Sequence, residues 1–136
     1  MQCSASSCGS FSMRILVVDD NRLLATILAD HLAARGHAAV AAFDGHMAEV
    51  FCARDSFDLL VIDMVLPELD GIDLLARLRG KGNSASAMII TGFPELAREE
   101  TARLNTLNVA AVLHKPFSFS DVDDVLDRLG YGSLTT

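Results

Sequence analysis

The stretch LLVIDMVLPELDG, residues 59–71, decides how the rest of the chain is arranged. Its first four residues are apolar, and a short, wholly apolar run predicts a strand buried on both faces, as in a parallel sheet. Asp63 ends this run, at the C-terminal edge where open α/β sheets place their ligands. Pro67 cannot donate to a sheet ladder, so the strand ends before it. We therefore expect a carboxylate at the ligand-binding edge of a buried sheet.

Apolar runs on both sides of this stretch alternate with segments of helical periodicity. The predicted strands cover residues 14–18, 37–43, 58–62, 87–91 and 109–114. The predicted helices lie within residues 21–36, 46–54, 70–79, 94–106 and 118–129. This alternation favours a parallel sheet with helices on both faces. The sequence thus predicts one α/β domain, with a doubly wound, five-stranded parallel sheet and five helices.

Apolar residues at helical spacing indicate which side of each helix faces the core. For the first helix these residues are Leu24, Ile27, Leu28 and Leu32, with Leu23 widening the stripe. For the second helix they are Met47, Val50 and Phe51, and for the fourth they are Leu96, Leu104 and Leu107. Cys52 is expected on or near such a face as a structural thiol.

Length and composition exclude several classes of protein. The 136 residues fit one domain, and 51% apolar residues suffice for a core. The net charge of −7 argues against a nucleic-acid or anionic-membrane surface. No apolar run approaches the roughly 18 residues of a membrane span, and the start has no secretory signal. Three unevenly spread cysteines form no disulfide framework, so we expect a reducing, cytoplasmic setting.

The ends of the chain differ in composition from the middle. Residues 1–12 are small, polar and rich in serine, and we interpret them as a flexible leader. Residues 13–130 form the predicted domain, and residues 131–136 form a short tail that frays. The sequence shows no internal repeat and no linker, so we expect no second domain.

Polar residues end four of the five predicted strands. They are Asp19, Asp20, Asp63, Thr91 and Lys115. Clustered carboxylates raise one another's pKa values unless a cation is present, and their hard oxygens suit Mg²⁺. A lysine and a threonine hydroxyl can hold the oxygens of an anion beside the metal. One carboxylate can then act as the nucleophile and form an aspartyl-phosphate.

These residues resemble a response-regulator receiver domain of the two-component, CheY-like type. The motifs are the acidic pair Asp19-Asp20, the central Asp63 with Pro67 and Asp70-Gly71 after it, Thr91, and Lys115-Pro116-Phe117. Each motif alone is weak, but all of them in register are specific. The resemblance extends from about Arg14 to Leu129 and implies the strand order 2-1-3-4-5.

The resemblance implies a role for each site residue. Asp63 accepts the phosphoryl group. Asp20 binds Mg²⁺ directly, Asp19 binds it through water, and the backbone carbonyl of Val65 is a further ligand, with Mn²⁺ as an alternative ion. Thr91 binds a phosphoryl oxygen and moves inward, and Lys115 pairs with the phosphoryl group. The peptide bond between Lys115 and Pro116 is expected to be cis.

The resemblance also implies partners. The phosphoryl donor is a histidine kinase or a histidine phosphotransfer protein, and the output is a phosphorylation-dependent protein contact. The chain is thus expected to be a single-domain phosphoacceptor and not an enzyme, although it assists its own phosphorylation and dephosphorylation. We expect no nucleic acid or membrane partner, and a monomer or a weak dimer through the face of helix 4, strand 5 and helix 5. A receiver that works without phosphorylation, or a fragment of a larger regulator or hybrid kinase, are the alternatives.

Two positions depart from the usual family pattern. Receivers commonly carry an aromatic residue three positions before the lysine, where this chain has Val112. We hypothesise that Phe93, two residues after Thr91, takes part in the switch instead. Val65 and Phe93 flank the path of a water that would attack the phosphorylated acid. Because both are apolar and cannot orient that water, we predict slow self-dephosphorylation.

Other readings fit less well. Haloacid-dehalogenase-type phosphatases carry a second acid two residues after the nucleophile, where this chain has Val65, and flavin-binding modules need a phosphate loop where it has Asp19-Asp20-Asn21. We interpret His31, His37, His46 and His114 as solvated or hydrogen-bonded residues that bind no ligand. The acids at 121, 123 and 124 complement the dipole of the last helix as a solvated face.

Overall fold

The computed structural model describes residues 13–129, so the predicted leader and the predicted tail lie outside the described residues. The strands are β1 (Arg14–Val18), β2 (Ala38–Ala42), β3 (Leu59–Asp63), β4 (Ser86–Thr91) and β5 (Val109–His114). The helices are α2 (Arg22–Ala34), α3 (Gly45–Arg54), α4 (Gly71–Gly80), α5 (Pro94–Glu99), α6 (Thr101–Thr106) and α7 (Phe119–Arg128). In this range, no helix is long and apolar enough to cross a membrane.

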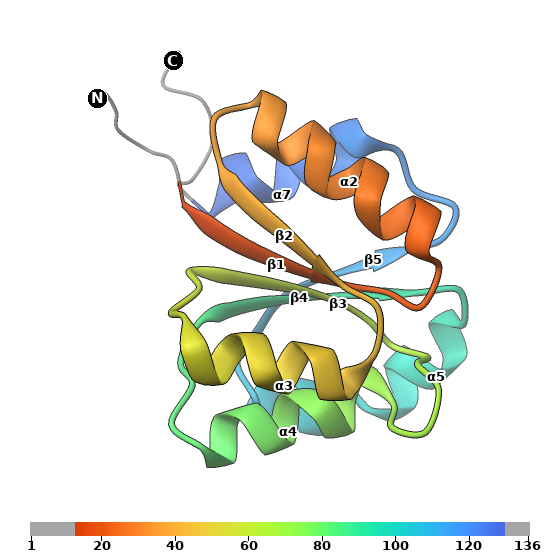
Figure 1. The fold of residues 1–136 in the computed structure, drawn as a ribbon. Helices are drawn as coiled ribbons and strands as arrows, with labels where there is room; N and C mark the ends of the chain where they lie inside the picture. Colours follow the sequence, from red (N-terminus) through yellow and green to blue (C-terminus); the bar gives the residue numbers. More distant parts are fainter. Residues whose placement is uncertain (1–12, 130–136) are drawn as a thin grey trace.

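The five strands form one parallel sheet in the order β2-β1-β3-β4-β5, which confirms the predicted fold class and strand order. All five residues of β3 are buried, as a central strand of a parallel sheet requires. Helices α2 and α7 cover one face of the sheet, and α3, α4 and α5 cover the other (Figure 1). The sheet therefore separates two apolar cores.

The predicted helix over residues 94–106 is in fact two helices, so the described chain has six helices where five were expected. The break lies at Glu100, whose φ and ψ are −100° and 13°. The Thr101 hydroxyl donates to the carbonyl oxygen of Arg98 at 2.8 Å and lies 3.5 Å from that of Ala97. A threonine hydroxyl that competes for helix carbonyls in this way favours a bend or a break.

The core face of α2 differs from the predicted one. Its buried residues are Ala25, Leu28, Ala29 and Leu32. Leu23 and Ile27, which were expected to face inward, are 71% and 43% exposed. Alanines at two of the four buried positions let α2 approach the sheet closely, and leucine spacing alone cannot reveal such a face. Val50 and Leu96 were also expected in core faces and are exposed in the structure.

His31 and His37 are hydrogen-bonded within the fold, which is one of the two alternatives that the sequence left open for them. His31 Nε2 lies 3.0 Å from both carboxylate oxygens of Asp123, which also pairs with Arg35 at 3.3 Å. The expectation that Asp123 belongs to a solvated face is therefore wrong, because it joins α7 to α2. His37 is buried, and its Nδ1 accepts a hydrogen bond from the Met13 N–H at 3.2 Å.

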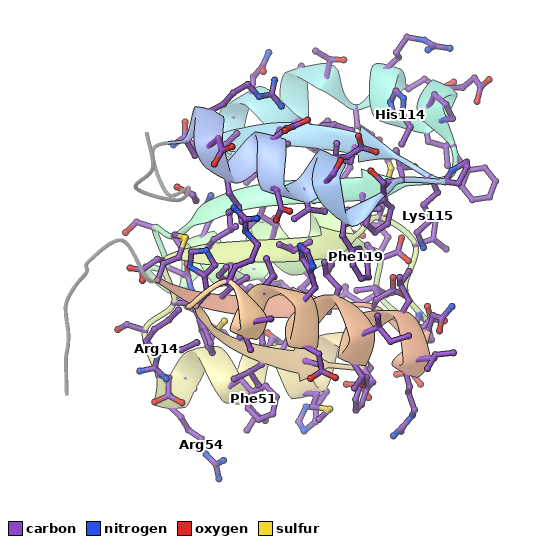
Figure 2. All side chains as sticks on the ribbon, turned by 90° about the horizontal axis from the view of Figure 1, so that it is seen from above. Arg14, Phe51, Arg54, His114, Lys115 and Phe119 are labelled. Carbon is purple, nitrogen blue, oxygen red and sulfur yellow. The ribbon has the colours of Figure 1, made fainter. Side chains whose placement is uncertain are left out.

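The strands start at one edge of the sheet and deliver their last residues to the other. Arg14 and Lys115 mark these two edges in Figure 2. Helix α7 follows β5 and packs back against the sheet, so it ends near the edge where β1 begins (Figure 1). The first and last described residues thus lie away from the C-terminal edge, where the polar residues gather.

Candidate functional site

The C-terminal edge of the sheet brings together the residues that the sequence singled out. Asp19 and Asp20 follow β1, Asp63 ends β3, Thr91 ends β4 and Lys115 follows β5. Carboxylate oxygens of the three acids lie within 4.8 Å of one another. Within residues 13–129 they form the one cluster of acidic, histidine or cysteine side chains that could hold a metal ion. Asp19 and Asp63 are buried, whereas Asp20 is exposed.

Lys115 is the cation of this acidic edge. Its Nζ donates to Asp63 Oδ2 at 2.9 Å and lies 3.5 Å from Asp19 Oδ2. Partial burial by itself would lower the pKa of Lys115, but the hydrogen bond and the charge of Asp63, with a further contribution from Asp19, outweigh it and raise this pKa above its usual value. The lysine therefore stays charged at neutral pH.

Asp19 is held by the backbone around it. Its Oδ1 accepts a hydrogen bond from the Asn21 N–H at 2.9 Å. The pKa of Asp19 is raised from 3.8 to about 6, mainly because the side chain is buried; Asp63 adds to this rise, while the Asn21 N–H and the charge of Lys115 oppose it. Two buried carboxylates with one shared lysine carry surplus negative charge, which a bound cation would relieve.

Asp63 is fixed from both sides of its carboxylate. Oδ1 accepts the N–H of Val65 at 3.1 Å, and Oδ2 accepts Lys115. Val65 lies in the loop that joins β3 to α4, and its side chain is 47% exposed. The predicted role of its carbonyl as a metal ligand stays a prediction, as do the roles of the other site residues.

Thr91 is fully buried at the end of β4. Its Oγ1 accepts a hydrogen bond from the Phe93 N–H at 2.8 Å. Phe93 is 52% exposed and is the N-cap residue of α5, where no side chain caps the helix. The two members of the hypothesised switch are therefore in direct contact.

Between α5, α6 and β5 lies a hollow of about 260 Å³, which Pro94, Val112 and other residues line. Val112 therefore borders an open space.

The loop after β5 places Lys115. The Lys115 N–H donates to the Thr91 carbonyl at 2.7 Å, which extends the pairing of β5 with β4 by one residue. The peptide bond between Lys115 and Pro116 is cis, as the resemblance implies. His114 is exposed and lines the hollow beside α5, so it does not join the acidic edge.

Sequence reasoning missed the part that Asn21 plays. The Asn21 N–H binds Asp19, and its side chain accepts the N–H of Leu24 at 3.1 Å as the N-cap of α2. A polar residue of the N-cap type directly before a helical apolar stripe was the signal that could have indicated it. Asn21 thus joins the acidic turn to the start of α2.

Known proteins resemble the chain over most of its length. The model of the response regulator receiver domain matches residues 15–127. The transcriptional regulatory protein TctD of Salmonella typhimurium is 35% identical over 120 residues, which are 86% of this chain and 51% of TctD. This chain spans about half the length of the curated relatives it matches.

Two solved structures agree with this match. The receiver domain of the Francisella response regulator 1452 has a TM-score of 0.74 at 26% identity, over 87% of this chain and 99% of that domain. A response regulator of Burkholderia pseudomallei has a TM-score of 0.73 at 26% identity, over 83% of this chain and 65% of the other. Receiver domains take their phosphoryl group from histidine kinases and typically bind Mg²⁺ in an acidic pocket. The chain belongs to the family of response regulator receiver domains.

Proposed function

We propose that this protein accepts a phosphoryl group on Asp63 from a histidine kinase or a histidine phosphotransfer protein, with Mg²⁺ bound. The contact of Lys115 Nζ with Asp63 Oδ2 at 2.9 Å, beside two further acids, is the observation that carries this proposal. A nucleophile, Asp63, a cation for the incoming phosphoryl oxygens, Lys115, and acids that could bind a metal ion thus lie together at one edge of the sheet. A phosphorylated aspartate and a calcium ion in the Burkholderia structure support it.

The acid group fits a divalent metal ion. Asp20, Asp63 and the Val65 carbonyl would bind it directly, and Asp19 would bind it through water; Mn²⁺ is the alternative ion. When bound, the ion supplies positive charge that stabilises the transferring phosphoryl group. The hard oxygen ligands and the surplus negative charge at Asp19 are what support this assignment.

The transfer forms one bond and breaks one. A carboxylate oxygen of Asp63 attacks phosphorus, the new P–O bond forms, and the P–N bond of the donor phosphohistidine breaks. The imidazole leaves with the electron pair of that bond and is protonated. Lys115, whose charge is now shared between Asp63 and Asp19, turns to the phosphoryl oxygens. The chain is thus a phosphoacceptor that assists its own modification, and not an enzyme acting on other molecules.

The same site supports a switch. The Thr91 hydroxyl, which now accepts the Phe93 N–H, can donate to a phosphoryl oxygen once that group arrives. Rotation of the hydroxyl releases the Phe93 amide. We infer that Phe93 and α5 then change position. Val112 lines the hollow that α5 borders, so it lies next to the elements that move.

The signal then passes by protein contact in the cytoplasm. Phosphorylation-dependent binding of a partner, or weak dimerisation through the side of α5, α6, β5 and α7, is the output we propose for the chain as a stand-alone regulator. A role as the receiver part of a longer regulator or hybrid kinase is the second candidate, because the chain spans about half of its curated relatives. Function without phosphorylation would leave the complete acid group unexplained.

The first test is incubation of the protein with Mg²⁺ and acetyl phosphate, followed by intact mass. We expect a gain of one phosphoryl group in the wild type, and no gain with a chelator or in Asp63→Asn. Asp127→Asn, an exposed acid of α7, is the matched control and should accept the group normally. No gain in the wild type, together with no Mg²⁺ binding by calorimetry, would disprove the proposal.

A further inference from the structure

Helices α3 and α4 begin in the same way, with an aspartate as N-cap and a buried glycine as the first helical residue. Asp44 Oδ1 accepts the N–H of Met47 at 2.7 Å, and Asp70 Oδ1 accepts the N–H of Asp73 at 2.8 Å. Such caps account for the aspartates. They leave open why both helices continue with glycine, which is a poor helix former.

Gly71 is required for space. A Cβ atom at this residue would lie 2.2 Å from the carbonyl oxygen of Asp63 and 2.9 Å from Ile62 Cγ2. The φ angle of Gly71 is not positive, so conformational freedom is not the reason for glycine here. The Gly71 N–H also donates to the Met64 carbonyl at 2.8 Å. The start of α4 therefore lies directly against the backbone of the acceptor residue.

Gly45 borders the same loop from α3. A Cβ atom at Gly45 would lie 3.3 Å from Leu69 Cδ2 and 3.7 Å from Leu74 Cδ1. Leu69 is half-buried and lies near the end of the loop that joins β3 to α4. The clash at Gly45 is milder than the one at Gly71, because the end of a leucine side chain can shift whereas a backbone carbonyl cannot.

This acceptor loop, residues 64–70, carries the groups that set the geometry of Asp63. Its Met64 N–H donates to the Ile90 carbonyl at 2.7 Å, which fixes one end on β4. The Val65 N–H of this loop donates to Asp63 Oδ1. After the loop, the Gly71 N–H donates back to the Met64 carbonyl and so joins the two ends of the loop. Any displacement of the start of α4 is therefore passed to the acceptor loop and to Asp63.

We propose that Gly71, with Gly45 as a weaker second, is a positioning residue for the acceptor site. The missing side chains let two helix starts close on the acceptor loop, and so fix the Asp63 backbone and the Val65 peptide. The proposal rests on the proposed function, because the geometry it protects is that of the metal ligands and the nucleophile. Neither glycine touches the reacting atoms.

The test compares three alanine variants that differ in the space around the new Cβ atom. Gly71→Ala meets backbone, Gly45→Ala meets a side chain, and Gly80→Ala, at the other end of α4, meets nothing within 4 Å. Mg²⁺ affinity is measured by calorimetry at a temperature where circular dichroism shows each variant to be folded. Amide exchange of Val65 is measured without metal, and melting temperature is recorded alongside.

We expect Gly71→Ala to weaken Mg²⁺ binding by about tenfold or more, as disturbed supports of metal ligands do. Gly45→Ala should weaken it less, and Gly80→Ala should leave it unchanged. The Val65 amide should exchange faster in the same order. A merely structural role would lower the melting temperature but leave the affinity and the Val65 exchange of the folded protein unchanged, and that result would overturn the proposal.

Two further outcomes are also decisive. If Gly71→Ala does not fold, Gly45→Ala carries the test, and wild-type affinity and Val65 exchange in that variant would overturn the proposal. If the wild type neither binds Mg²⁺ nor accepts a phosphoryl group, the proposed function fails. The exchange of the Val65 amide needs no metal, so it would still decide whether the two glycines position the loop.

Discussion

Lys115 reaches Asp63 across a strand that lies between them. Its Nζ is 2.9 Å from Asp63 Oδ2, although β5 and β3 are not neighbours and β4 separates them in the sheet. The lysine side chain therefore extends over the end of β4, where Thr91 is buried. Any group attached to Asp63 would meet the lysine and the threonine together, because both lie on that side of the acid.

The shared lysine leaves Asp19 with too little positive charge around it, so we predict that Asp19→Asn stabilises the metal-free protein. In the fold the pKa of Asp19 is raised from 3.8 to about 6 by burial and by Asp63. The charged form therefore destabilises the fold above pH 6. The gain at pH 8 should be about 1–3 kcal/mol, measured by urea unfolding with a chelator.

The same variant should bind Mg²⁺ more weakly, and its stability advantage should shrink as the pH falls below about 6 and vanish near pH 3. Asp20→Asn is the control, because Asp20 is exposed and its substitution should change the free energy of unfolding little. Equal stability of Asp19→Asn and wild type at pH 8 would contradict the prediction.

Self-dephosphorylation should be slow, with a half-life well above seconds. Val65 and Phe93, which lie two positions after Asp63 and Thr91, have apolar, exposed side chains, and neither can orient an attacking water. The double variant Val65→Asn with Phe93→Glu should lose its phosphoryl group at least about tenfold faster, because a positioned polar group lowers the barrier. Decay of the intact mass of the phosphorylated protein measures the rate.

Phe93→Leu is the matched variant for this experiment, since it keeps an apolar side chain and should decay as slowly as the wild type. A phosphorylated wild type that decays within seconds would rule out the explanation.

Phosphorylation should loosen α5 and leave α6 in place. Only Ala97 of α5 is buried, and the Phe93 amide before it depends on Thr91 Oγ1. In contrast, α6 is fixed by the buried Leu104 and by the ion pair of Arg103 with Asp73. Amide exchange should therefore rise from Phe93 to Glu99 in the phosphorylated protein, with little change after Glu100.

Two variants test the cause. Thr91→Val has no hydroxyl to hold the Phe93 amide, so its exchange in α5 should be high in both states. Phe93→Ala should reduce phosphorylation-dependent partner binding once a partner is in hand. An equal change in α5 and α6 would show that the break at Glu100 does not confine the response.

The buried His37 should make the protein less stable in mild acid. Burial lowers the pKa of His37, the charge of Arg35 lowers it further, and Asp123 opposes them. Its Nδ1 also accepts the Met13 N–H, which only an unprotonated nitrogen can do. The stabilisation is therefore present above pH 6.5 and is lost as the pH falls below that value, by up to about 1.4 kcal/mol per pH unit for one proton.

Urea unfolding between pH 8 and 5 measures this loss, and His37→Gln should show a smaller one because glutamine accepts a hydrogen bond without titrating. His46→Gln is the control, since His46 is exposed on α3. Identical pH profiles for wild type and His37→Gln would show that His37 does not titrate in this range.

The sequence predicted those features correctly that depend on a single pattern, such as a run of apolar residues. Apolar runs predicted the five strands, and the polar residues that end them are gathered at one edge, because parallel strands must deliver their last residues there. Leucine spacing failed for α2, since two of its four buried residues are alanines and Leu23 lies outside. The break at Glu100 was missed because it depends on a threonine hydroxyl, which periodicity does not register.

The site was predictable as a set of residues and less so as a geometry. Asp19, Asp20, Asp63, Thr91 and Lys115 could be grouped from strand ends alone. Which atoms meet depends on distances between strands that are remote in sequence, such as the contact of Asp63 with Lys115. The steric need for Gly71 likewise follows only from where α4 starts relative to the backbone of Asp63.

The strands of this sheet begin at the edge opposite to the acids, and α7 ends there too (Figures 1 and 2). A fluorescent protein or an affinity tag joined to either end of the described domain would therefore lie on the side opposite the C-terminal edge of the sheet. Pairs of such labels can report assembly of two copies while the edge that carries Asp63 stays uncovered for the proposed phosphoryl transfer. A label attached at either end of the described domain would therefore not cover the edge of the sheet that carries the acidic residues.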